Sequence, residues 1–94
     1  MKEIILLPIV GTFAEDKDKA RDIRLNKIIP ILDVEKQIIL NFEGIESATQ
    51  SFIHALISDI IRQKGSKILD NIYFKSCNEN IQKIINIVVE YMQV

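Results

Sequence analysis

The sequence predicts a small α/β fold in which helices pack on a single-layer, mainly parallel β-sheet. Dense apolar runs of strand length alternate with segments whose apolar residues recur every three or four positions. The resulting order is strand, helix, strand, helix, strand, helix, which is typical of parallel sheets with helical crossovers. With 94 residues, 48% of them hydrophobic and 27% charged, we expect residues 1–94 to form one domain with one core.

The first strand is predicted over Glu3–Val10, an Ile-, Leu- and Val-rich run whose length suits burial on both faces. Pro8 has no backbone donor, so this strand should lie at an edge or bend there. The polar stretch 11–19 follows as a loop in which an extra short strand could hide. Asp16 or Asp18 is the predicted N-cap of the next helix.

That helix carries apolar residues at helical spacing from Ala20 to Leu32, with Leu25 among them. Pro30 should end or kink it near Ile29, because proline removes a helical hydrogen bond. The second strand is predicted over Gln37–Phe42, where an apolar run lies between charged residues.

Two Ser-x-x-Glu/Gln patterns predict the starts of the last two helices. The first, Ser47 to Gln50, opens a helix that ends in a basic turn before Gly65. The third strand is predicted at 71–75, and the second capping pattern, Ser76 to Glu79, opens a final helix with one apolar face.

Composition makes several function classes improbable. A net charge of -1 argues against nucleic-acid binding, which needs a concentrated cationic surface. One cysteine, one histidine and three glycines leave no material for a disulfide framework, a cysteine- or histidine-built metal site or a glycine-rich phosphate loop. The apolar run Ile4–Val10 is far too short to span a membrane. We therefore expect a cytoplasmic protein without a membrane span, a metal or a cofactor.

The candidate site is the junction between the second strand and the following helix. Open α/β sheets place functional sites beyond the carboxyl ends of their strands, and a hydroxyl in the first turn of a helix is a sensible phosphate acceptor. We expect a partner-binding surface there that comprises Glu43, Gly44, Glu46, Ser47, Thr49, Gln50, Ser51 and His54. The structural alternative is that Ser47 caps the helix while Thr49 and Ser51 bond locally.

Other chemistry has weaker support. Ser51 and His54 are three residues apart and could approach on a helix, but Asp59 lies about 140° further round and cannot orient His54 well. Cys77 lies beside a helix start that could lower its pKa. Arg21, Arg24 and Lys27 form a narrow basic stripe that could meet a phosphate or an acidic partner, although an exposed helix face explains it equally.

At the same junction the sequence resembles the STAS-like domains, which are related to bacterial anti-sigma-factor antagonists. The segment Ile38–Glu46 is similar to their aliphatic strand and its Gly-Ile turn, and Ser51-Phe52 is similar to the start of their next helix. The similarity spans about residues 11–61, and the last third agrees in element order only.

The resemblance implies a compact α/β domain that acts by protein–protein contact. In the antagonist relatives an Asp-Ser-Ser-Gly motif carries the serine that an anti-sigma-type kinase phosphorylates, and Ser51 matches that serine. Thr49 stands in place of the aspartate and Phe52 in place of the glycine, and Asn41 stands where the pattern usually has Asp. We expect the Phe52 side chain to point into the core.

The leading hypothesis is therefore a non-enzymatic regulatory module that binds a partner protein, an anti-sigma-type kinase or ATPase, with Ser51 as phosphoacceptor. A small-ligand or nucleotide-binding domain that uses the same strand-to-helix edge is the alternative. A small hydrolase built on Ser51 and His54 is a third. The isoleucine-rich helices could also support a homodimer.

Overall fold

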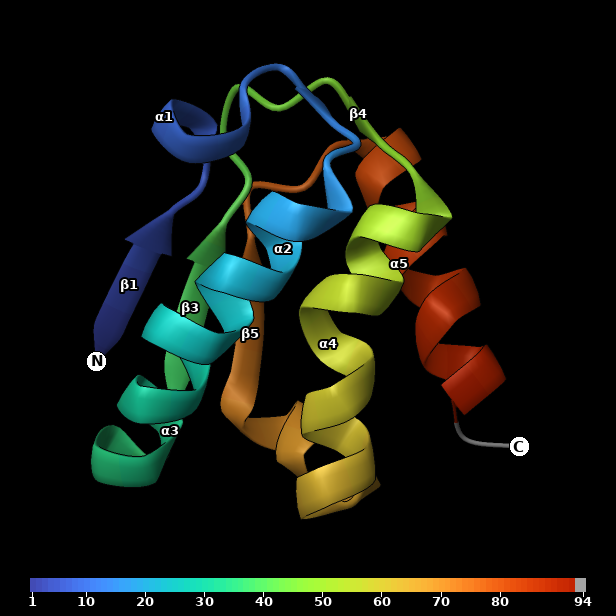
Figure 1. Cartoon of the computed structure of the whole chain (residues 1–94). Helices are drawn as coiled ribbons and strands as arrows, with labels where there is room; N and C mark the ends of the chain where they lie inside the picture. The colour runs from blue at the N-terminus through green and yellow to red at the C-terminus, as the bar shows by residue number, and fades with distance from the viewer. Residues whose placement is uncertain (93–94) are drawn as a thin grey trace.

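The computed structural model describes residues 1–92 of this chain. Three strands, β1 (Lys2–Ile5), β3 (Ile38–Asn41) and β5 (Ile72–Lys75), form a parallel sheet in the order β1-β3-β5. In the register, Ile4 lies beside Leu40 and Leu40 beside Phe74. The carboxyl ends of all three strands therefore meet at one edge, which lies at the top of Figure 1. The mixed α/β fold with a small parallel sheet is confirmed.

Within residues 1–92, helices cover one face of this sheet and leave the other uncovered (Figure 1). Ile4, Leu40 and Ile72 are buried on the covered face, whereas Ile5 and Tyr73 are exposed on the other. The expectation that the first strand is buried on both faces is therefore wrong. Side chains alternate across a strand, so a two-layer arrangement buries every second residue.

The first strand is also shorter than predicted. β1 ends at Ile5, and Leu7–Val10 form a short helix, α1, with Pro8 in its first turn. Proline fits that position because its fixed φ is helical and the first-turn N–H groups have no helical partner. β1 is nevertheless an edge strand, as expected. The short strand that could hide in the following loop exists: β2 (Phe13–Ala14) pairs in parallel with β4 (Ser47–Ala48).

The next helical stretch runs through α2 (Lys17–Ile23), the π-helical turn η1 (Arg24–Ile28) and α3 (Ile29–Glu35). Asp16 caps α2, because its carboxylate accepts the N–H groups of Asp18 and Lys19. The helix does not end near Ile29. In the wider turn the Ile29 N–H donates to the carbonyl of Arg24, five residues back, and Pro30 falls in the first turn of α3, where its missing donor costs little.

The sequence pattern places the N-caps of the last two helices, Ser47 and Ser76, two residues too early. α4 (Gln50–Lys64) is capped by Thr49, whose Oγ1 accepts the Phe52 N–H at 3.0 Å. α5 (Glu79–Met92) begins after Asn78, whose Oδ1 accepts the Ile81 N–H at 2.9 Å. Ser47 cannot cap because it is paired in β4, and Ser76 lies in a turn with positive φ. As expected, α4 ends at Gly65, and the 3-10 turn η2 (Ser66–Asn71) leads to β5.

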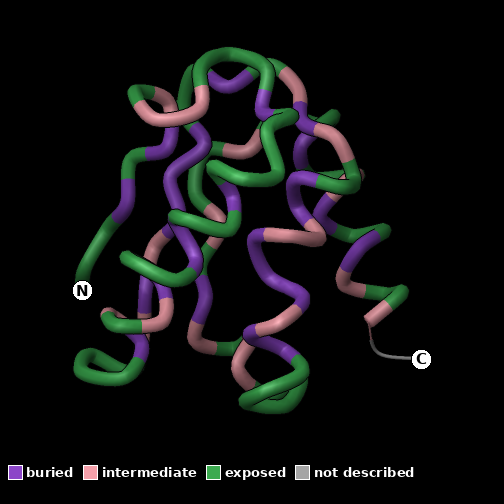
Figure 2. The backbone as a smooth tube through the Cα atoms, in the orientation of Figure 1, coloured by how far each residue is buried: buried purple, intermediate pink, exposed green. Residues whose placement is uncertain are grey.

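The core lies between the sheet and the helices. Figure 2 shows buried residues along β3 and the inner side of α4, and Phe42 and Phe52 are fully buried there. Phe52 thus points inward as predicted. Among the described residues, none of the helices has the length and apolar character that crossing a membrane requires.

Candidate functional site

The turn after β3 is held by contacts from several directions. Asn41 Oδ1 accepts the Glu43 N–H at 2.8 Å, and Asn41 Nδ2 donates to Glu3 Oε2 at 2.7 Å. Gly44 has a φ of 83°, and a Cβ there would lie 2.7 Å from Cδ2 of Leu7. A glycine is therefore required where α1 packs against this turn.

The rest of the connection is held from both ends. The Glu46 N–H donates to the carbonyl of Thr12 at 2.8 Å. Asn78, the cap of α5, donates from Nδ2 to the carbonyl of Glu46 at 2.9 Å. The exposed side chains of Glu43 and Glu46 therefore project from a backbone that is anchored to two other segments.

The eight residues of the expected partner surface fall into separate groups. Glu43, Gly44 and Glu46 are exposed in the turn above the sheet. Gln50, Ser51 and His54 instead line a hollow on the helical side. Ser47 and Thr49 are half-buried between the two groups.

The three hydroxyls of this segment have different environments. Ser47 is paired in β4 and half-buried, and the Thr49 hydroxyl caps α4. Ser51 is the second residue of α4 and is exposed. Of the three, only Ser51 combines exposure with a position in the first helical turn.

The helix hollow, a surface pocket of about 460 Å³, lies between the starts of α2 and α4 and the side of α5. Its apolar wall is formed by Ala55 of α4 and by Ile87, Val88 and Tyr91 of α5. Ile87 is 46% exposed and Tyr91 is 71% exposed, so large apolar surface faces solvent there.

The polar side of the helix hollow consists of Lys17, Gln50, Ser51 and His54. Within residues 1–92, the lining contains one lysine and no carboxylate. Hydrolysis by Ser51 and His54 would require an acid that orients the histidine, and the lining supplies none. Among residues 1–92, no hydrogen bond joins the side chains of Ser51 and His54.

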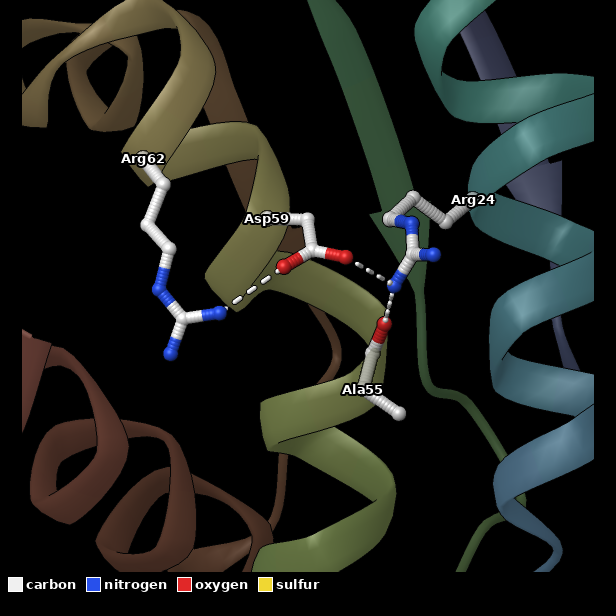
Figure 3. A network of polar contacts seen from close by, with 4 residues as sticks. All are labelled: Arg24, Ala55, Asp59 and Arg62. Atoms are coloured by element: carbon white, nitrogen blue, oxygen red, sulfur yellow. Dashed lines mark hydrogen bonds and ion pairs between the residues drawn. The ribbon is translucent and has the colours of Figure 1, made fainter.

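Asp59, the acid considered for His54, belongs to a different network, shown in Figure 3. Its Oδ2 lies 3.3 Å from Nη1 of Arg24, and its Oδ1 accepts a hydrogen bond from Arg62 at 2.9 Å. The same Arg24 nitrogen donates to the carbonyl of Ala55 at 2.7 Å. Arg24 thereby ties the π-helical turn to the middle of α4.

This network overturns the predicted basic stripe. Arg24 is buried, while Arg21 and Lys27 are exposed and Leu25, expected on the apolar face, is exposed as well. A sequence signal for this existed, because Arg24 is four residues from both Ala20 and Ile28 and thus lies in their apolar stripe. Its partner Asp59 is 35 positions away, so no local pattern could identify it.

Cys77 does not have the activated character considered for it. The thiol is half-buried in the loop between β5 and α5, and this burial raises its pKa. A raised pKa leaves less of the reactive thiolate at neutral pH. Within the described part of the chain, histidine, cysteine and carboxylate side chains form no cluster of three that could hold a metal ion.

The fold and these sites define a class: a small α/β domain with helices on one face of a parallel sheet, an anchored turn at the strand ends and an exposed helix start beside a hollow. Residues 19–82 match the family described as STAS-like domain of unknown function (DUF4325). The chain belongs to this family, and the resemblance drawn from the sequence is confirmed. No curated protein and no solved structure matches the chain significantly.

Proposed function

We propose that this chain is a regulatory module that acts by binding a partner protein and catalyses no reaction itself. The partner is an anti-sigma-type kinase or ATPase. The contact surface comprises the turn residues Glu43, Gly44 and Glu46 and continues over Ser47 and Thr49 to Gln50, Ser51 and His54. Membership in a STAS-like family and the anchored, exposed turn support this proposal.

The single observation that carries the switch is the position of Ser51. Its hydroxyl is exposed in the first turn of a 15-residue helix, where the helix dipole stabilises added negative charge. Phosphorylation would add about 1.5 to 2 negative charges at this point. A phosphate within the contact surface would weaken the binding of a docked partner, because it is costly to desolvate and repels any carboxylate of the partner that lies against Ser51.

Labelling with the partner kinase tests this. A tagged copy of the chain retrieves the partner from its host, and mass spectrometry identifies it. Incubated with that partner and ATP, the wild-type chain should gain one phosphate and the Ser51→Ala variant none. Ser66→Ala, which removes another exposed helix-start hydroxyl, should be labelled like the wild type. Equal labelling of Ser51→Ala and the wild type would contradict the switch.

A second pair of variants tests the surface separately from the switch. Glu46→Lys reverses a charge in the anchored turn and should weaken partner binding. Glu35→Lys makes the same change at the end of α3, which lies away from the carboxyl ends of the strands in Figure 1. This control variant should bind the partner with wild-type affinity. If both variants retain wild-type affinity in a calorimetric titration, the contact surface is assigned to the wrong place.

A further inference from the structure

We propose that the helix hollow binds a small amphiphilic anion, namely a molecule with an apolar ring or short chain and a carboxylate or phosphate head. The hollow shares Gln50, Ser51 and His54 with the contact surface proposed above, but the inference goes beyond that proposal because it rests on the lining of the hollow and not on the identity of a partner. Its volume of about 460 Å³ falls within the range of small-molecule sites, about 300–1,000 Å³.

The apolar residues of α5 that line the hollow determine the apolar part of the proposed ligand. Ile87 and Tyr91 are one helical turn apart and expose large apolar surface, and Val88 and Ala55 complete the apolar lining of the hollow. Such a wall favours a ring or a short chain, because contact with it removes apolar area from water.

The charge of the head is specified by the opposite side. Among the described residues that line the hollow, Lys17 supplies the one formal charge and none is a carboxylate. Gln50 and Ser51 add hydrogen-bonding groups from the first turn of α4, the positive end of a long helix. An anion is therefore attracted to this hollow, whereas a cation of the same size is repelled by the positive charge of Lys17.

The arrangement differs from the site expected from the sequence. The sequence predicts a ligand site at the strand-to-helix edge and the positive end of α4. The lining includes Gln50 and Ser51 from that helix start, but its other residues come from α2, from farther along α4 and from α5, and none of them belongs to the β3–β4 turn. Only the tertiary packing brings Lys17 and Tyr91 to the same hollow, since they are 74 positions apart in the chain.

Nuclear magnetic resonance titrations of the full ¹⁵N-labelled chain test the proposal. The probes are phenyl phosphate and benzoate, with benzylamine and benzyl alcohol as cationic and neutral rings of similar size and inorganic phosphate as the head alone. Saturable shifts at the amides of Ser51, Ile87 and Tyr91 are expected for one or both anionic rings, and their comparison identifies the preferred head. Benzylamine and inorganic phosphate should bind more weakly. Equal binding of benzylamine, or no saturable shift at these amides with either anionic ring up to millimolar concentration, would overturn the proposal.

Two variants, each with a matched control, test whether Lys17 binds the anionic head and Tyr91 contacts the ring. Lys17→Gln should weaken binding of the anionic rings by about two- to fivefold, the range for a solvent-exposed charge pair, and leave benzyl alcohol unchanged. Lys67→Gln, in η2 at the far end of α4, should have no effect.

Tyr91→Ala should weaken all the ring probes by about threefold or more through lost apolar contact, while Val34→Ala, which removes another strongly exposed apolar side chain, should change nothing. All four substitutions are at exposed positions, so each variant should retain the wild-type spectrum elsewhere. Unchanged affinity of the anionic rings for Lys17→Gln, or of every ring for Tyr91→Ala, would refute the assignment.

Discussion

Arg24 shows how one residue can link two elements. Its side chain is 9% exposed, and a single guanidinium nitrogen contacts both Asp59 and the carbonyl of Ala55. Nε of Arg24 is buried and lacks a hydrogen-bond partner among the described residues. A buried charge is costly unless it is paired, so Arg24 depends on Asp59.

The Asp59→Asn variant tests this dependence. It keeps the side-chain shape and removes the negative charge that faces Arg24. Because Asp59 is 38% exposed, solvent screens part of the loss, and we expect the free energy of unfolding to fall by about 1–2 kcal/mol. Urea denaturation of the purified variant measures this change.

Asp33→Asn is the matched control. Asp33 pairs with Lys64 at 2.8 Å, and the Asp33 side chain is mostly exposed, so its removal should cost less than about 1 kcal/mol. The double variant Arg24→Met/Asp59→Asn should recover part of the stability, because the buried guanidinium charge is removed together with its partner. If Asp59→Asn costs no more than Asp33→Asn, Arg24 does not depend on its partner.

At the scale of elements, the helix starts position the candidate site. Thr49 begins α4 two residues later than the sequence pattern indicates, and this leaves Ser51 in the first turn. Asn78 caps α5 and also holds the carbonyl of Glu46. Both caps therefore contribute to the geometry of the surface as well as to helix stability.

Substitution of the two candidate caps of α4 distinguishes the structure from the sequence pattern. Thr49→Ala removes the acceptor of the Phe52 N–H and should lower the free energy of unfolding by about 0.5–2 kcal/mol. Ser47→Ala, in β4, should change it by less than about 0.5 kcal/mol. Thermal and urea unfolding compare the two, and a larger loss for Ser47→Ala would mean that Ser47 is the cap.

At the scale of the whole molecule, the sheet is asymmetric. The helices cover one face, and on the other face Ile5 and Tyr73 remain exposed around the contacts of Glu3 with Asn41 and Lys75. Neighbouring residues of one strand therefore have opposite environments. In β1, Ile4 is 6% exposed and Ile5 is 56% exposed.

Alanine substitution of these two isoleucines should give very different results. Ile4→Ala leaves a cavity beneath the helices and should lower the free energy of unfolding by about 2–4 kcal/mol. Ile5→Ala removes surface that is already largely hydrated and should cost less than about 1 kcal/mol. Denaturant unfolding measures both, and equal losses would show that the second face of the sheet is also covered.

Much of the fold could be predicted because its signals are local. The apolar run around Leu40, the periodic face of α4 and the Gly65 stop each depend on neighbouring residues. The errors arose where one pattern fits two structures. The run Glu3–Val10 suits either one strand or a strand followed by a helical turn with Pro8, and a hydroxyl near a helix start suits either a cap or a strand residue.

The sequence by itself determined the α/β order, the apolar runs of the three main strands, the end of α4 at Gly65 and the candidate hydroxyl at Ser51, because spacing and helix-stop residues are properties of consecutive positions. Only the tertiary structure decided which sheet face is open, that Arg24 is buried against Asp59, and that Lys17, Ser51 and Tyr91 line the same hollow. These features depend on which surfaces the chain packs together across long separations. Local patterns leave that choice open, because the apolar face of one helix can be buried against any of several other elements.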